Sequence, residues 1–163
     1  MNTLISEDKD IDHLHDVLRH IQNVRDNCDL LGGRLIEGGE KELGIQLISL
    51  GLIHDYSKLH NKLEFDSLRE SLKGTPEFEA AVISHINTNN HHPESWAGID
   101  NMPRIYIAEM VCDWKARSSE FANDLRSWIK EKATKKFKFS CNGSTYKEIR
   151  FFVETLLDES FKD

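Results

Sequence analysis

The stretch Ile45-Gln-Leu-Ile-Ser-Leu-Gly-Leu-Ile-His54-Asp55 is an apolar run that ends in two adjacent residues able to ligate a metal. Its apolar pattern predicts a helix from about Glu40 to Tyr56. Neighbouring residues on a helix point about 100° apart, so His54 and Asp55 can both reach one centre only where the helix end opens onto it. The stretch therefore predicts a helix that delivers two side chains to a shared site.

Further residues of the same chemical types lie on other segments of the chain. Imidazole nitrogens and carboxylate oxygens together suit a transition metal, and ligands scattered along a chain make sense only if folding brings them to one point. The candidate ligands are His20, His54, Asp55, His85, His91, His92 and Asp113. The alternative is a group of unrelated core and surface histidines. His13 shares a helix face with His20, so it is either a neighbour of the site or exposed; we expect it to be exposed, as we do His15 and His60.

Hydrophobic periodicity predicts helices almost throughout, with no strand-like alternation long enough to form a sheet. A first helix of about five turns is expected from Ile11 to Val24. Later helices are expected after the capping residue Thr75, with His85 pointing inward, after Pro103, around Phe121 to Lys132, and from Thr145 to Leu157. The predicted fold is all-α, a compact single-domain helical bundle over residues 1–163, with a metal-site core at about 11–118 and C-terminal packing helices at about 119–160.

Two segments are predicted to be loops. Leu31 to Glu40 contains four glycines, which favours a mobile turn or lid. Asn87 to Met102 is polar and contains Pro93 and Gly98, so it is expected to close over the site. The Gly-rich segment also contains Arg34, a candidate contact for substrate.

Composition limits the classes of function. The 163 residues are 39% hydrophobic and 30% charged, without an apolar stretch near the roughly 20 residues that span a bilayer. The acidic first ten residues lack the pattern of a secretory signal, so we expect a cytoplasmic protein that does not bind membranes. A net charge of −7 disfavours stable nucleic-acid binding. The basic stretch Lys130 to Lys138 is either a solvated helix end or a small contact surface for an anionic partner.

The cysteines and the large aromatic residues give weaker indications. Cys28, Cys112 and Cys141 are widely separated and odd in number, so we expect reduced thiols rather than disulfides or a zinc ribbon. Four large aromatic residues contribute either to core packing or to a homodimer interface. They are Trp96, Trp128, Phe151 and Phe152.

The ordered set of His, His-Asp, His, His and Asp resembles the HD superfamily of metal-dependent phosphohydrolases, over roughly His20 to Arg117. His54-Asp55-Tyr56-Ser57-Lys58 resembles the His-Asp-x-x-Lys form of the motif. Asn90-His-His-Pro-Glu94 with Glu109-Met-Val-Cys-Asp-Trp114 is similar to segments of small HD-like proteins of bacteria and phages. The chain departs from the shortest HD pattern by its extra histidines, which in the superfamily usually accompany two metals.

The resemblance implies a role for each candidate. The first divalent metal, iron, manganese or a similar ion, would be held by His20, His54, Asp55 and Asp113. The second would be held by Asp55, His85 and one or both of His91 and His92. Asp55 and Lys58 would be catalytic, and Lys58, His92 and Arg34 would contact substrate. Weaker candidates for outer-sphere or phosphate contacts are Glu64, Glu94, Glu109, Arg104 and Arg117.

The implied reaction is hydrolysis of a phosphate ester, in a nucleotide or a related small phosphorylated molecule, by metal-activated water. Two other functions stay open at this point. Some HD-fold proteins with a similar ligand set are di-iron oxygenases. The chain could also be a non-catalytic, metal-stabilised nucleotide-binding protein.

Overall fold

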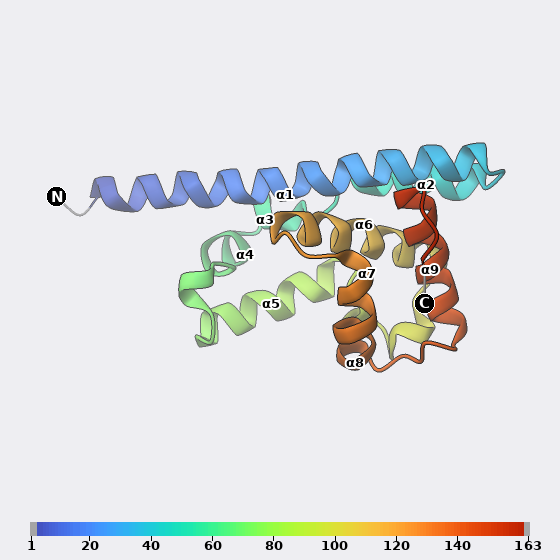
Figure 1. Ribbon diagram of the computed structural model, residues 1–163. Helices are drawn as coiled ribbons and strands as arrows, with labels where there is room; N and C mark the ends of the chain where they lie inside the picture. Colours follow the sequence, from blue (N-terminus) through green and yellow to red (C-terminus); the bar gives the residue numbers. More distant parts are fainter. Residues whose placement is uncertain (1–2, 162–163) are drawn as a thin grey trace.

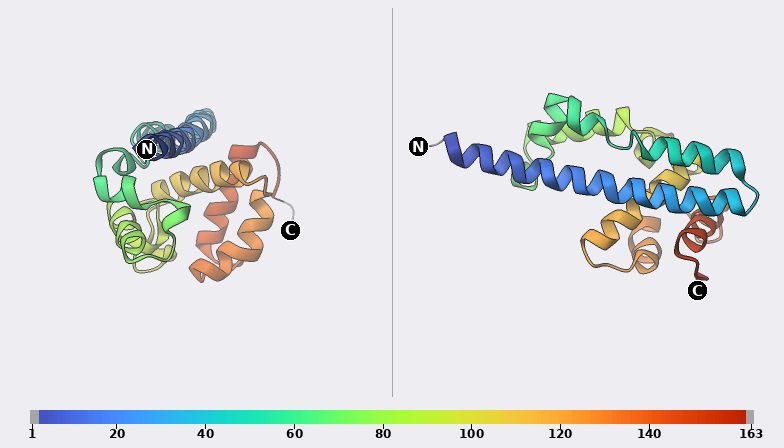
Figure 2. Two further views of the ribbon diagram at one scale, coloured as in Figure 1. Left: turned by 90° about the vertical axis from the view of Figure 1, so that its left-hand side faces the viewer. Right: turned by 90° about the horizontal axis from the view of Figure 1, so that it is seen from above.

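A single long helix, α1 (Thr3–Glu37), runs the length of the molecule (Figure 1). The computed structural model describes residues 3–161, with the backbone alone for residues 3–8. After a turn at Gly38 and Gly39, helix α2 (Lys41–Gly51) returns along α1. Viewed along α1, this pair lies over the rest of the chain (Figure 2). The first helix is thus much longer than the expected segment from Ile11 to Val24.

The expected lid from Leu31 to Glu40 was wrong, because most of it continues α1. Gly32 lies where α1 meets α2, and a Cβ atom there would be 2.6 Å from Ile48 Cγ1 and 2.8 Å from the Gly44 carbonyl oxygen. Gly32 therefore allows close packing of α1 against α2. Only Gly39, with φ of 94°, has the left-handed backbone of a turn in this segment.

Two short helices and a 3₁₀ turn connect α2 to the longer helix α5. They are α3 (Ser57–His60), α4 (Lys62–Ser67), the 3₁₀ turn η1 (Glu70–Leu72) and α5 (Pro76–Thr88). As predicted, Thr75 caps α5, since its hydroxyl accepts a hydrogen bond from the Phe78 N–H at 3.2 Å. His85 is buried on the inner face of α5. The predicted loop follows, with the 3₁₀ turns η2 (Pro93–Ser95) and η3 (Ile99–Asn101).

Helix α6 (Arg104–Glu120) packs against α1, α2 and α9. The chain then forms α7 (Leu125–Trp128), a π-helical turn (Ile129–Ala133), α8 (Thr134–Phe137) and α9 (Ser144–Leu157). The predicted helix from Phe121 begins late, because Ala122 has a left-handed φ of 53° and Asp124 caps α7 instead. The helix predicted from Thr145 to Leu157 is confirmed as α9. The part of the chain described here is all-α, without a strand.

The core lies between α1, α2, α6 and α9. Trp128 packs edge-on against Trp114, with ring centroids 4.9 Å apart, and Phe152 is fully buried. Cys28 and Cys112 are buried free thiols, and Cys141 is an exposed one. Of the described helices, none combines the length and apolar character that a membrane crossing requires.

Candidate metal centre

The turn between α2 and α3 positions His54 and Asp55. Helix α2 ends at Gly51, before the expected end at Tyr56, and Asp55 has a φ of 53°. This left-handed conformation is uncommon for residues with a side chain, but aspartate tolerates it better than most. Because the backbone leaves the helix here, both side chains face the same interior space, and both are buried.

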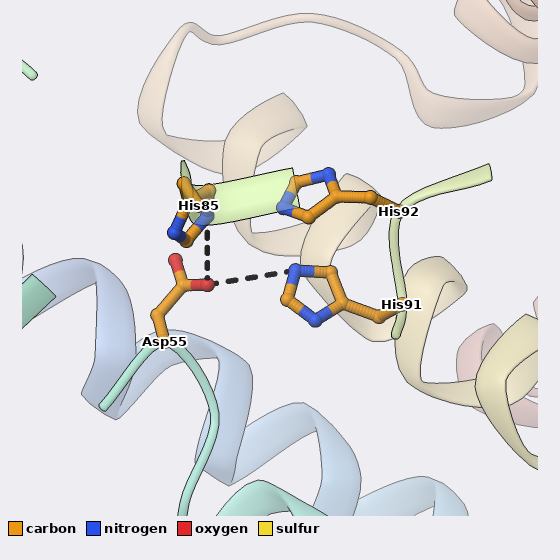
Figure 3. A group of neighbouring side chains, drawn as sticks. All are labelled: Asp55, His85, His91 and His92. Carbon is orange, nitrogen blue, oxygen red and sulfur yellow. Dashed lines mark ion pairs between the residues drawn. The ribbon is translucent and has the colours of Figure 1, made fainter. Parts of the chain in front are cut away.

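Asp55 lies between two groups of histidines. Its Oδ2 atom is 3.7 Å from His20 Nε2 on α1 and 3.6 Å from His54 Nε2. Its Oδ1 atom is 3.2 Å from His85 Nε2 on α5 and 3.5 Å from His91 Nε2 in the following loop (Figure 3). The two carboxylate oxygens thus face different sets of imidazoles, which is the arrangement that a bridging ligand needs.

The remaining candidates join the same cluster. Asp113 on α6 places Oδ1 3.1 Å from His20 Nε2, and His92 lies beside His91 with ring centroids 4.2 Å apart. Potential ligand atoms within 4.8 Å of one another form three overlapping groups. These are Asp55, His85, His91 and His92; His20, His54 and Asp55; and His54, His91 and Asp113. All seven residues predicted from the sequence as ligands are therefore brought together.

Unsatisfied polar atoms are concentrated in this cluster. Among the described residues, seven buried side-chain nitrogen or oxygen atoms make no hydrogen bond, and six of them belong to the cluster. The six are Nε2 of His20, His54, His91 and His92, and Oδ1 of Asp55 and Asp113. Buried polar atoms are costly unless they have partners. Nitrogen and carboxylate donors aimed at one space fit a divalent transition metal, which would supply that partner.

Outer carboxylates hold three of the imidazole rings. The Nδ1 atoms of His20, His54 and His85 lie 2.9, 3.0 and 3.1 Å from carboxylate oxygens. Their partners are Glu120, Glu109 and Glu64, respectively. A carboxylate that accepts a hydrogen bond from Nδ1–H keeps the ring proton on Nδ1 and leaves the Nε2 lone pair free for a metal.

Two of these carboxylates, Glu64 and Glu109, were only weak candidates in the sequence, and Glu120 was missed. A signal for Glu120 was available, because it follows Asp113 by two helical turns on the same face of α6. Glu64 also accepts hydrogen bonds from Ser57 at 2.6 Å and Ser84 at 2.8 Å. Glu64 is thus itself fixed in place.

The carboxylates of the cluster are ionised at neutral pH. Burial alone would raise the pKa of Asp55, but the ammonium of Lys58 and the neighbouring imidazoles, led by His54, lower that pKa well below its usual value. Burial opposes ionisation of Glu109 too, yet hydrogen bonds from His54 and His91 bring its pKa to about 2. The site therefore holds negative charge that a bound cation would offset.

The pKa values of the adjacent loop histidines shift in opposite directions. Burial, followed by the proximity of His91 and His85, lowers the pKa of His92 to about 3. Burial also opposes the charging of His91, but Glu109 and Asp55 outweigh it and raise the His91 pKa. His92 is accordingly neutral at physiological pH, the form in which an imidazole binds a metal.

Two cavities meet at the cluster. One, of about 450 Å³, is lined by Asp55, Lys58 and Arg69, and the other, of about 300 Å³, by Trp114 and Phe137. Residues that line both cavities are His92, Asp113, Arg117 and Phe121. Lys58 projects toward the cluster from α3, and its Nζ atom lies 2.5 Å from Asp55 Oδ2. A molecule in either cavity would therefore touch the ligand cluster.

Two arginines that were candidates for substrate or phosphate contacts instead hold helices together. Arg34 lines neither cavity, because its guanidinium donates to the carbonyl oxygens of Thr155 and Leu156 at 3.0 and 2.8 Å. The structure thus places Arg34 at the end of α9, where it lines neither cavity. Arg104 is likewise structural, with ion pairs to Glu40 and Glu148.

The structure also places four further polar residues that were considered from the sequence. Glu94 lines the smaller cavity and lies 3.7 Å from Lys136, which belongs to the basic stretch. His13 is half-buried and lines the larger cavity, so its expected exposure was only partly right. His15 and His60 are exposed, as predicted.

A family model matches residues 9–159, which include every residue of the cluster. It is described as a family of unknown function, DUF5662. The chain belongs to the DUF5662 family. Comparisons with curated proteins and with solved structures found no match. The chemistry proposed for this DUF5662 member therefore rests on its own residues and on the resemblance noted in the sequence.

Proposed function

We propose that this protein is a metal-dependent phosphohydrolase with a binuclear centre of the HD type. The observation that carries the proposal is the cluster of six buried, unsatisfied ligand atoms around Asp55, with Lys58 beside it. The division of the ligands fits two metals that share Asp55. His20, His54 and Asp113 would hold one metal, and His85, His91 and His92 the other.

When bound, two divalent metals supply a hydroxide at neutral pH and electrophilic stabilisation of phosphoryl oxygens. The protein's own groups complete the site. Lys58 offers an ammonium next to Asp55 Oδ2, where it can bind a phosphate oxygen. Glu64, Glu109 and Glu120 fix the orientation of the imidazoles. The chain thus supplies both the anion contact and the rigid ligand frame that the reaction needs.

The smaller cavity supports a nucleotide as substrate. Its walls include Trp114, Phe121 and Phe137, and Phe121 is 68% exposed at the edge shared with the larger cavity. Ser118 and Asn123 add a hydroxyl and an amide. Aromatic faces with a few polar groups are the usual surroundings of a nucleobase. We place the reaction in the cytoplasm, since the free cysteines suit a reducing compartment.

The test combines metal content with product release. We expect about two equivalents of metal per chain, and phosphate or nucleoside monophosphate from a panel of nucleotides and cyclic nucleotides in the presence of manganese under anaerobic conditions. Asp55→Asn should lose both metals and the activity, because asparagine tolerates the left-handed backbone but lacks the charge. The control is Asp66→Asn, which removes only a surface ion pair with Lys62.

Three results would contradict the proposal. Retention of both metals by Asp55→Asn would show that Asp55 is not the bridging ligand. Oxygen consumption by the iron-loaded protein, without hydrolysis of any phosphate ester, would favour an oxygenase. Tight nucleotide binding without any product would favour a binding protein.

A further inference from the structure

Arg117 is an accessible cation at the junction of the two cavities. Among the described residues, it is the only arginine or lysine that lines both of them. Lys58 and Arg69 line the larger cavity alone, and Lys136 lines the smaller one alone. The side chain of Arg117 is 45% exposed, so a molecule in either cavity can reach it.

Helix α6 places Arg117 beside the ligand cluster. Arg117 follows Asp113 by four residues, which puts the two on the same face of the helix and about 6 Å apart along its axis. This spacing permits an ion pair, but Asp113 Oδ1 lies 3.1 Å from His20 Nε2, and Arg117 Nη1 lies 3.1 Å from Glu120 Oε2. Arg117 is thus one helical turn from a candidate ligand without pairing with it.

Glu120 keeps the guanidinium in this position. Its Oε1 atom accepts hydrogen bonds from His20 Nδ1 at 2.9 Å and from Asn23 at 3.1 Å, and its Oε2 atom accepts from Arg117. Glu120 is the only described residue that forms a hydrogen bond or ion pair with Arg117. Because a guanidinium carries five N–H donors and stays charged, donors remain for an anion.

A short series of contacts connects this arginine with Lys58. The Lys58 Nζ atom lies 2.5 Å from Asp55 Oδ2, which lies 3.7 Å from His20 Nε2. The same His20 nitrogen lies 3.1 Å from Asp113. The two cations therefore flank two carboxylates that meet at one imidazole. A phosphate bound at this point offers several acceptor oxygens, and arginine binds such oxygens with pairs of N–H groups.

We propose that Arg117 binds the phosphate group that lies at the metals, and thereby fixes the substrate across the junction of the two cavities. The inference rests on the proposed function and adds a second cationic contact to that of Lys58. Trp114, three residues before Arg117, lines only the smaller cavity. The rest of the nucleotide would therefore extend from the phosphate into the smaller cavity. Arg117 is a specificity residue here and takes no part in proton transfer.

Binding of an uncleavable phosphate analogue tests the assignment. Methylphosphonate is titrated calorimetrically into manganese-loaded protein freed of unbound metal. Arg117→Gln should lower the affinity by about tenfold or more, as for a lost charge-assisted hydrogen bond, and Arg117→Lys should recover part of that loss. Arg126→Gln is the matched control, because it removes a surface ion pair with Glu159 and lines neither cavity. It should bind as the wild type does.

Metal affinity separates phosphate binding from an indirect role through Glu120. If Arg117 only held Glu120, and through it His20, then Arg117→Gln would weaken manganese binding. We expect manganese affinity, measured by competition with a chelator, to be unchanged in Arg117→Gln and to fall about 10–100-fold in Glu120→Gln.

Three results would overturn the inference. They are equal methylphosphonate affinity in Arg117→Gln and the wild type, a fall in manganese affinity that accounts for the weaker methylphosphonate binding, and no methylphosphonate binding by the wild type. Because the probe is not cleaved, a lack of hydrolase activity would contradict the proposed function and leave this measurement intact.

Discussion

At the scale of single residues, Asp55 joins the two halves of the ligand cluster. Its left-handed backbone turns both carboxylate oxygens into the interior, and each oxygen faces a different set of imidazoles. Lys58, one turn later, neutralises part of this charge. The residues around Asp55 therefore separate into those that would hold metal and those that would contact substrate.

Lys58→Met tests this separation. The ammonium contacts Asp55 but is not a metal ligand, so metal content should be unchanged. Loss of one charged hydrogen bond to phosphate should lower kcat/KM by about tenfold to a hundredfold. Elemental analysis and steady-state kinetics measure the two effects. Lys62→Met, at an exposed position four residues later, is the matched control. A variant with normal kinetics would remove Lys58 from the substrate site.

Glu109→Gln tests the outer carboxylates. Glu109 accepts from His54 at 3.0 Å and lies 3.4 Å from His91, so one substitution disturbs the orientation of two ligands. We expect metal affinity to fall by about 10–100-fold, measured by competition with a chromogenic chelator. Glu94→Gln, at the edge of the smaller cavity, should leave the affinity unchanged. Equal affinities for the two variants would contradict the role given to Glu109.

The sequence was sufficient to select the seven candidate ligands, because their residue types and order are visible without a fold. It could not select the outer carboxylates with the same certainty. Glu64 becomes a partner of His85 only because α4 packs against α5. The sequence around Glu64 does not indicate that packing. Arg34 is the opposite case. It was predicted to contact substrate from a lid, but it donates a hydrogen bond to the Leu156 carbonyl oxygen at the end of α9.

At the scale of elements, the α1–α2 pair depends on its small residues. Periodicity predicted helix in both segments, but the glycines suggested a loop between them. A glycine that allows close packing and one that forms a turn look the same in sequence, and only the partner helix distinguishes them. Gly32 and Gly39 illustrate the two uses within one short segment.

Gly44→Ala and Gly33→Ala should have opposite effects on stability. A methyl group at Gly44 would collide with the Gly32 carbonyl oxygen, whereas one at Gly33 would meet nothing within 4 Å. We expect Gly44→Ala to lower the free energy of unfolding by about 1–3 kcal/mol or more. Gly33→Ala should raise it by about 0.5–1 kcal/mol, since alanine is the better helix former. Urea denaturation measures both, and destabilisation of equal size would refute this account of the packing.

At the scale of the whole molecule, the ligand cluster joins α5 and its following loop to α1, α2 and α6, which already pack against one another. α1, the turn after α2, α5 with its following loop, and α6 each contribute at least one member. A metal bound there would join all four, so its removal should destabilise the entire fold and not one segment.

The loss of stability on metal removal can therefore be predicted in magnitude. With free metal a hundredfold above Kd, binding adds about 2.7 kcal/mol to the free energy of unfolding. For a protein of this size, chelation should then lower Tm by about 5–11 °C. Differential scanning calorimetry before and after chelation measures the change, with Asp55→Asn as the control that should not respond. An unchanged Tm in the wild type would contradict metal binding by the folded chain.

The position of the cluster members along the chain also determines the order of events during synthesis. His20 is translated early, but Asp113 lies on α6, well past the middle of the sequence. While the ribosome is still making the intervening segments, the nascent chain presents isolated histidines with no shared centre. The position that Asp113 would complete must therefore wait until α6 has emerged and folded, whereas all residues assigned to the other position precede α6. The two metals would then enter in a fixed order, and neither would serve as a template for the first helix alone.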